Sequence, residues 1–562
     1  MKNAIHAMRA RFPKTAAVSG NIADPRLIHF NLNPEISAPK GSRGRLGLAL
    51  RNIRVELVPR YLCSSMKITL LTALLAFSCG SALAAGPAAP GESAARPASG
   101  FELRVPAPGP DVIADNVLQE AIDKVASAGG GVVLLGAGDF KLSRQAGDET
   151  VVIKSNVTLR GQGYATHIYL DPKTPPNDLR YFPVRIGSAK VPAHHVVIEH
   201  LRYTGNDKAI GGGSIMGFNA RLDEPESLLL SCDNITIRHC WIYDAKQAAG
   251  CTKPATAMYL AKHVIPAAEA KAAAADKQKV RAGYFDADRM ATQFKNWQVH
   301  NNYIDTCGNK AVELAECHGG LIADNHIVNV VDGPQVIFGS RHVHIKDNTV
   351  YFNRTGINIS EGSHHIRVSG NHVEPMPEMK KNPANACLIF RTEPLPLHST
   401  ISDVVVAGNI FRSQNETSRC TVRLQTQVEA LSCCYAGIVF TGNTFDGDIE
   451  FSDKRNPAKT SLKEILFADN LCNGDLLSVP AGTMASSTVV VRGNLLRKAG
   501  TLTLNASEWI WTGNTHANGT LEIATDAKAN LIHGNFTPSP IIDHGTETSL
   551  SGNIVRKKSK TP

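Results

Sequence analysis

Apolar and polar residues alternate in a short phrase that recurs along the middle of the chain. Four asparagines mark the recurrences at intervals of 23 residues: Asn302, Asn325, Asn348 and Asn371. Alternation of this kind is typical of β-strands, in which successive side chains point to opposite faces. It therefore predicts one inward-facing column of apolar side chains: Val299, Ile322, Ile345 and Val368.

A 23-residue repeat with strand periodicity indicates a solenoid, in which each repeat is one coil and neighbouring coils join by parallel strand pairing. Asparagine suits a fixed turn position, because it tolerates left-handed backbone angles and its amide can hydrogen-bond to the amide of the next coil. The series continues with irregular steps at Asn409, Asn443, Asn470, Asn494, Asn514, Asn535 and Asn553. Upstream, Cys240 occupies the same position in the phrase NITIRHCWI.

These phrases, among them VVVAGN and WIWTGN, resemble the right-handed parallel β-helix, or pectin-lyase-like, superfamily of carbohydrate-active proteins. The segment from Asp115 to Leu142 is similar to the capping helix, glycine turn and first strand that open many such solenoids. The resemblance covers residues 111–555 and implies an all-β, right-handed parallel β-helix with an N-terminal capping helix. It implies an architecture and not one reaction, because this fold hosts lyases, hydrolases, transferases, epimerases and non-catalytic binders.

The start of the chain predicts export. A signal peptide is expected at 66–84, with Lys67 as its basic residue, an apolar run, and Ala82-Leu83-Ala84 as its cleavage site. Residues 1–65 then form an upstream extension that is not translated or not retained, 85–110 a flexible lead-in, and 111–562 a single domain. The expected location is the periplasm or the medium, without insertion in a membrane.

Net charge does not indicate a polyanionic partner. The chain has 59 basic and 50 acidic residues, a formal balance of +9. Residues 1–65 and Lys67 account for 12 basic residues and 3 acidic ones, which leaves 59 − 12 = 47 against 50 − 3 = 47. The electrostatic argument for nucleic-acid binding therefore disappears with the leader.

Two interruptions of the repeat predict the working face. Surplus residues lie near 245–294, where the sequence favours a helix, and near 374–387. Both insertions are expected to leave the solenoid on one edge and to flank the three regular coils between them. Such an arrangement predicts a groove with walls and a flat floor, the kind of surface on which solenoids bind elongated ligands.

Counting from each asparagine gives the residues of this floor. The predicted catalytic groups are two carboxylates and two cations: Glu313, Asp332, Lys310 and Arg354. The carboxylates are expected to act as acid and base, and the cations to orient the substrate or neutralise it. The predicted substrate-binding amides are Asn309, Gln335 and Asn358. The same outward polar residues are also what any solvated sheet requires.

A second column repeats at 23 residues on another turn: His318, Arg341 and His364. Histidines near carboxylates can bind a metal or titrate near neutral pH, although a solvated turn explains the column more simply. Glu316 beside this column and Asp305 before the floor are further candidates. No cofactor is predicted, and a divalent cation stays an open alternative.

One local phrase suggests a narrower relationship. CGNKAVEL, Cys307 to Leu314, resembles the CGN-x-VEL phrase of inulin fructotransferases and difructose anhydride hydrolases. That resemblance implies a catalytic acid at Glu313. The position of the partner aspartate in those enzymes holds Asn301 here, and one residue is inserted before Glu313.

The sequence therefore predicts an exported carbohydrate-active enzyme that cleaves a polysaccharide or oligosaccharide by carboxylate acid/base chemistry, as a glycoside hydrolase or transglycosylase. One alternative is a polysaccharide lyase in which Lys310 or Arg354 abstracts a proton from a uronate. Another is a non-catalytic carbohydrate-binding surface protein. Ten cysteines follow the signal segment, and their spacing favours places in the core over a disulfide framework.

Overall fold

The computed structural model describes the part of the chain that carries the repeats. The described residues are 100–143, 151–173, 183–188, 191–205, 214–219, 231–252, 294–377, 386–392, 400–413, 420–426, 433–451, 460–474, 485–497 and 501–556. The chain divides into two units, Met1–Pro90 and Gly91–Pro562, and every described residue lies in the second. The predicted upstream extension and signal peptide lie outside the described residues.

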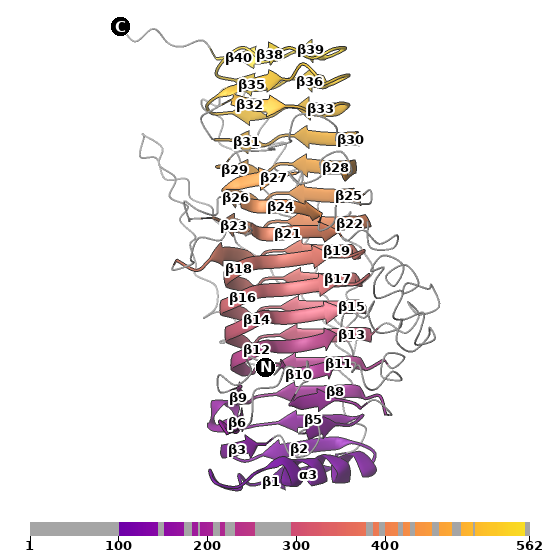
Figure 1. Cartoon of the computed structure of the whole chain (residues 1–562), viewed down its shortest axis with the longest axis vertical. Coiled ribbons are helices and arrows are strands. Elements are labelled where there is room, and N and C mark those ends of the chain that lie inside the picture. Colours follow the sequence, from indigo (N-terminus) through magenta and orange to yellow (C-terminus); the bar gives the residue numbers. More distant parts are fainter. Residues whose placement is uncertain are drawn as a thin grey trace, which may run out of the picture. The chain divides into compact units, whose positions relative to one another are not determined.

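Parallel strands form each coil, and the coils stack into three faces (Figure 1). The first face is a 16-stranded sheet. Its strands are β1 (Glu102–Val105), β2 (Gly131–Leu135), β5 (Val157–Arg160), β8 (His194–Glu199), β11 (Asp233–Arg238), β13 (Phe294–His300), β15 (Cys317–Ala323), β17 (Arg341–Lys346), β19 (His364–Ser369), β22 (Thr400–Ala407), β25 (Cys433–Thr441), β28 (Thr460–Ala468), β30 (Ala485–Arg492), β33 (Trp509–Thr512), β36 (Leu531–His533) and β39 (Ser549–Ser551).

The second face begins directly after each first-face strand and belongs to a 21-stranded sheet. Its strands are β3 (Gly138–Leu142), β6 (Thr166–Leu170), β9 (Arg202–Thr204), the first halves of β12 (Trp241–Thr252), β14 (Tyr303–Ala315), β16 (His326–Ile337) and β18 (Thr349–Ser360), and then β20 (His372–Pro375), β23 (Ile410–Arg412), β26 (Thr444–Asp446), β29 (Leu471–Cys472), β31 (Leu495–Leu496), β34 (Thr515–His516), β37 (Phe536–Thr537) and β40 (Ile554–Val555).

The third face completes the coil before the chain returns to the first face. Its strands are β4 (Val151–Ile153), β7 (Val184–Ile186), β10 (Ser214–Asn219), the second halves of β12, β14, β16 and β18, and then β21 (Ala386–Thr392), β24 (Cys420–Thr426) and β27 (Asp448–Glu450), followed by the separate sheet of β32 (Thr501–Leu504), β35 (Thr520–Ile523) and β38 (Ile542–Asp543). The prediction of an all-β, right-handed parallel β-helix is confirmed.

The corner between the first and second faces is held by the asparagine ladder, the series from Asn302 to Asn553. In the first step, Asn302 donates from its backbone nitrogen and from Nδ2 to Oδ1 of Asn325, each at 3.0 Å. The same two bonds link Asn325 to Asn348, and the pattern recurs down to Asn535 and Asn553. Cys240 enters the series by donating its backbone N–H to Oδ1 of Asn302 at 3.0 Å. The predicted amide stacking is thus confirmed.

The prediction that these asparagines take left-handed backbone angles is wrong by one position. The positive φ belongs to the residue just before each of them, as at Asn301 (φ 56°), Asp324 (φ 53°) and Asp347 (φ 54°). Later coils use glycine there, as at Gly408. The ladder asparagine itself is buried, and its side chain bonds to backbone and to the next amide instead of tightening its own turn.

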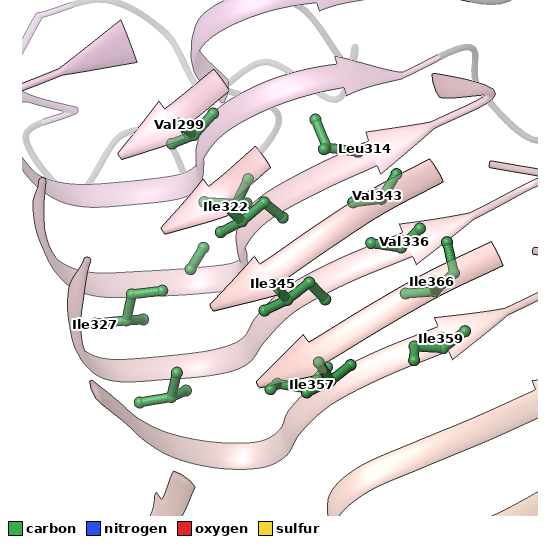
Figure 2. Close-up of a cluster of buried hydrophobic side chains, with 14 of the residues drawn as sticks. Val299, Leu314, Ile322, Ile327, Val336, Val343, Ile345, Ile357, Ile359 and Ile366 are labelled. Atoms are coloured by element: carbon green, nitrogen blue, oxygen red, sulfur yellow. The ribbon is translucent and has the colours of Figure 1, made fainter. Parts of the chain in front are cut away.

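The core is a set of apolar columns along the solenoid axis. The predicted column is confirmed, because Val299, Ile322, Ile345 and Val368 pair in register across neighbouring coils and are fully buried. Opposing side chains from the other faces fill the space between the sheets, among them Ile327, Val336 and Ile359 (Figure 2). Each coil therefore buries its apolar side chains only when its neighbours are present.

A single described helix, α3 (Asp115–Ser127), packs at one end of the stack (Figure 1). It buries Leu118, Ala121, Ile122 and Val125, and Asp115 accepts bonds from the backbone N–H and Oγ of Ser143. The predicted capping helix is confirmed. Among the described residues, no helix has the length and hydropathy needed to cross a membrane. A 3-10 turn, η1 (Gly163–Ala165), links β5 to β6.

The described cysteines mostly lie inside the solenoid, as predicted. Nine of the ten are buried, and Cys434 is half-buried. Burial raises the pKa of Cys240 to about 12, so its thiol stays protonated at neutral pH. These side chains act as small apolar core residues.

Two predicted boundaries are wrong. The lead-in was expected to reach residue 110, but Glu102–Val105 already forms β1, because its alternating side chains pair with β2. The insertion expected from 245 begins only after Thr252, since β12 continues that far. The second insertion follows Pro375 and ends before Ala386. The interiors of both insertions, 253–293 and 378–385, lie outside the described residues, and so does the predicted helix.

The two insertions also do not leave one edge, as was expected. The segment 253–293 joins the third face to the first, whereas 378–385 joins the second face to the third. In the solenoid from residue 100 to residue 556, every step from a first-face strand to the next second-face strand is short and fully described. Apart from the 3-10 turn η1 between β5 and β6, variation in coil length is therefore confined to the two corners that border the third face.

A charge in the apolar column should be strongly destabilising. Ile345→Asp is expected to lower the free energy of unfolding by roughly 4 kcal/mol, because an unpaired carboxylate would replace a fully buried side chain. Urea denaturation followed by circular dichroism measures the change. Lys346→Asp, on the outer side of the same strand, is the control and should cost less than about 1 kcal/mol. Near-native stability of Ile345→Asp would contradict the stacked core.

Loss of one ladder amide should also be costly. Asn348→Ala is expected to lower the free energy of unfolding by about 2–4 kcal/mol, because it removes the Nδ2 bonds to Asn371 and Ile322 and leaves the backbone N–H of Asn325 buried without its acceptor. Hydrogen exchange of that N–H should accelerate. Asn353→Ala, an exposed amide bonded to Asn329, is the control. Equal effects of the two substitutions would show that the ladder contributes no special stability.

Candidate active site

The predicted floor lies on the third face, in strands that continue around a corner. Asn309, Lys310, Asp332 and Arg354 were expected in a turn between strands. They lie instead within β14, β16 and β18, which run unbroken from the second face to the third. The register is irregular where the strands bend, between Asp305 and Lys310 for example, and this irregularity obscures the alternation in the sequence.

Strand register brings the predicted residues into two adjacent columns. One column pairs Lys310 with Asp332, and Asp332 with Thr355. The other pairs Glu313 with Gln335, and Gln335 with Asn358. Neighbours in a column lie on strands about 4.8 Å apart, so their side chains are in contact range. The predicted grouping of acids, cations and amides is therefore present.

Each carboxylate in this group is matched by one cation. Nζ of Lys310 donates to Oε1 of Glu313. Arg354 forms a two-pronged pair with Asp332, in which Nε donates to Oδ1 at 2.9 Å and Nη2 donates to Oδ2. The hydrogen bond to Asp332 raises the pKa of Arg354, which keeps the guanidinium charged. A cation held in this way is a poor proton acceptor.

The floor is more buried than expected. Glu313 and Asp332 are each only 4% exposed, which is less than the outward polar residues of a solvated sheet would show. Gln335 and Asn358 are 4% and 6% exposed. Oε1 of Gln335 and Oδ1 of Asn358 are buried, and neither has a hydrogen-bond partner among the described residues. A buried acceptor without a partner is costly, so these two amides are suited to accept bonds from a ligand.

The two carboxylates lie apart along the face. Asp332 is opposite Lys310, three residues before Glu313, so strand rise and strand spacing place the two Cα atoms about 11 Å apart. Each carboxylate also has its own cation. The two carboxylates therefore lie in different columns and do not share one cation.

Two other candidates lie outside this group. Asn309 is half-buried at the bend of β14, next to Lys310. Asp305 lies on the second face, in register with Tyr243 and Val328, and accepts a hydrogen bond from Oγ1 of Thr306 at 2.7 Å. Asp305 is therefore separated from the third-face carboxylates by the corner.

An apolar patch that the sequence did not suggest continues the third face. Ala386, Ile389 and Cys420 form a buried cluster separate from the main core. Ile389 pairs in register with Asn358 on one side and Arg423 on the other. Nε of Arg423 then donates to Oε2 of Glu450 at 2.8 Å. Irregular spacing after Asn371 hid this continuation, since these residues do not follow the 23-residue count.

The second column is present but on the first face. His318, Arg341 and His364 pair in register, and Lys295 extends the column. Burial, together with neighbouring cations and histidines, lowers the pKa of His318 and of His364. Glu316, at the adjoining corner, has a left-handed backbone (φ 53°). The segment 253–293 ends at this corner, so one of the two insertions borders the column.

A metal centre is not apparent in this part of the chain. Among the described residues, no group of three or more His, Cys, Asp and Glu side chains is arranged to hold a metal ion.

Comparison with known proteins bears on the fold. The family described as "Right handed beta helix region" matches residues 283–394, which include β14, β16 and β18. This match covers about a fifth of the chain and agrees with the right-handed parallel β-helix fold described above. No functionally curated protein matches the sequence.

Some solved structures are also similar to this chain. A mutant tailspike protein of E. coli bacteriophage HK620 is similar over 78% of this chain and 75% of its own, with 14% identity and a TM-score of 0.50. The same tailspike in complex with a pentasaccharide matches with a TM-score of 0.48, at 14% identity over 78% of this chain and 76% of its own. The A-module of the Azotobacter vinelandii mannuronan C-5 epimerase AlgE4 matches at 12% identity over 80% and 95%, with a TM-score of 0.34. The first of these similarities, with a TM-score of 0.50 at 14% identity, shows the fold alone.

Breaking one ion pair tests the electrostatics of the site. Arg354→Met should lower the free energy of unfolding by about 1–3 kcal/mol, because Asp332 would stay buried without its cation. Half of the Arg354 side chain is exposed, which keeps the expected cost below that of a fully buried pair. Arg160→Met is the control, since Glu199 keeps Arg238 as a partner at 2.7 Å. Equal costs measured by urea denaturation would contradict the pairing.

Proposed function

We propose that this chain is an exported, glycan-cleaving enzyme whose active site is the third face of β14, β16 and β18. Glu313 is the acid/base group in this proposal. Asp332 is the second carboxylate, and Lys310 and Arg354 set the charge of the two carboxylates. The amide oxygens of Gln335 and Asn358 accept hydrogen bonds from sugar hydroxyls.

The observation that carries the proposal is the pair of unpartnered, buried amide oxygens beside a buried glutamate. Gln335 stands in register between Glu313 and Asn358, so both amides and the carboxylate line one column. Hydroxyl groups are the donors that such oxygens need, and a sugar ring presents several of them on one side. A glycan lying along this column would place a glycosidic oxygen near Glu313.

The position of the column supports the same proposal. From β8 onward, coil length varies only at the two corners beside the third face, whereas the corner that carries the asparagine ladder is constant. Binding and catalytic residues commonly lie where a rigid scaffold meets variable segments. The third face meets this condition along both of its long sides.

The charges favour acid/base cleavage over elimination. In a lyase mechanism Lys310 or Arg354 would have to release its proton and then remove one from the substrate. Each of the two is instead paired with a buried carboxylate, and the pKa of Arg354 is raised. With carboxyl groups on separate columns, one in its protonated form would give its proton to the leaving oxygen, and the other, ionised, would take a proton from the attacking water, as in inverting hydrolases.

Substitution of Glu313 tests the proposal directly. Glu313→Gln keeps the shape of the side chain and is expected to lower turnover by at least about 100-fold, the lower end of what a general acid or base contributes. Activity is measured on a panel of neutral and acidic glycans, by new reducing ends and by the absorbance of new double bonds. Reducing ends without absorbance indicate hydrolysis, and absorbance indicates elimination.

Glu199→Gln is the matched control, because Glu199 is also buried and ion-paired but lies on the first face. It should leave turnover within about twofold while lowering stability. Full activity of Glu313→Gln would overturn the assignment of the site. Binding of a glycan with no product from the unsubstituted chain would favour a carbohydrate-binding surface protein instead.

A further inference from the structure

A run of aromatic rings lies on the outer side of the second face and has no part in the site described above. It runs from η1 to β20 along the coils that contain β9, β12, β14, β16 and β18, and these labelled strands stack one on another in Figure 1. We call it the aromatic strip, and its members are Tyr164, Trp241, Tyr303, His326, Tyr351 and His372.

The rings of the strip contact one another in sequence. Ring centroids lie 5.5 Å apart between Tyr164 and Trp241, and 6.1 Å apart between Trp241 and Tyr303. Tyr303 stacks on His326 at 5.2 Å with an interplanar angle of 15°. His326 and then Tyr351 continue the run at 6.1 Å per step, as far as His372. The strip is therefore continuous along the solenoid axis.

The strip is open to solvent at several points and carries an unused donor. Tyr164 is 58% exposed, His326 is exposed, and Tyr303 and Tyr351 are half-buried. Nε1 of Trp241 is buried, and no residue in the described part of the chain accepts a hydrogen bond from it. A tryptophan N–H normally finds an acceptor, so this atom is available to one supplied by a ligand.

Polar groups alternate with the rings. The guanidinium of Arg202 lies 6.0 Å from the centre of the Trp241 ring. Asp305 is in register with Tyr243, whose ring is 4.9 Å from that of Trp241. Flat apolar rings bordered by hydrogen-bonding groups suit a ligand with apolar C–H surfaces and many hydroxyls. A carbohydrate chain has this composition, whereas an apolar peptide would leave the polar groups unpaired.

The strip and the candidate active site belong to the same strands. β14 carries Tyr303 on the second face and Glu313 on the third. β16 carries His326 and Gln335, one on each side of its bend. A chain bound along the strip therefore lies one corner away from the proposed catalytic column.

We infer that the aromatic strip is a binding surface for a linear glycan, which it holds beside the third face. This inference extends the proposed function, because the glycan held on the strip would be the polymer that Glu313 cleaves. Cross-strand aromatic pairs also stabilise sheets without any ligand. The experiment that tests this inference must therefore measure glycan binding and not stability.

Affinity electrophoresis in native gels tests the inference. The gels contain a soluble neutral β-glucan, alginate or polygalacturonate, and every variant is made in a Glu313→Gln background so that no polymer is cleaved. The parent is expected to be retarded by at least one polymer. Trp241→Ala and Tyr303→Ala should each weaken binding about tenfold, because each removes a stacking ring. Trp241→Phe keeps a ring and should lose less.

Phe536→Ala is the matched control, since Phe536 is an aromatic residue on the second face, 37% exposed, and lies outside the strip. It should bind like the parent, and thermal unfolding of all variants establishes that they fold. Equal retardation of every variant, or no retardation of the parent by any polymer, would overturn the inference. If the strip variants bind glycan more weakly but the unsubstituted chain cleaves no polymer, the strip is a glycan-binding surface and the proposed enzymatic function is rejected.

Discussion

The hydrogen-bonded asparagine ladder is the interaction on which the rest of this solenoid depends. Each amide fixes the next coil through two bonds and is itself buried, so the corner between the first and second faces repeats without insertion from coil to coil. The left-handed residue before it completes the turn. With one corner fixed, length can vary only at the other two, and the third face between them becomes the part of the coil that can differ from its neighbours.

The repeating half of this structure could be predicted because its physical causes are local and periodic. Ile345 must be apolar to fill the core, and Asn348 must be an amide to bond in both directions, so both leave a 23-residue signal. The position of the insertions could not be predicted in the same way. The interval from Cys240 to Asn302 gives the number of surplus residues, but not the corner at which they leave the coil.

The residues of the candidate site could be predicted from the sequence, but the burial of their side chains could not. Counting from the asparagines placed Glu313, Gln335 and Asn358 in one column, as the register shows. The burial of the column depends on contacts distant in sequence. The aromatic strip was missed because its members vary among tryptophan, tyrosine and histidine, so no single residue type repeats at the coil length.

A crystal structure of the Glu313→Gln variant with a bound oligosaccharide tests the central claim most directly. The account predicts a sugar whose hydroxyls lie within hydrogen-bond distance of the Gln335 and Asn358 amides, with the rest of the chain directed towards Tyr303. An oligosaccharide bound on the first face, beside His318 and His364, would contradict it. In that case the working surface would be the histidine column, and the polar group on the third face would be part of the solenoid's own packing.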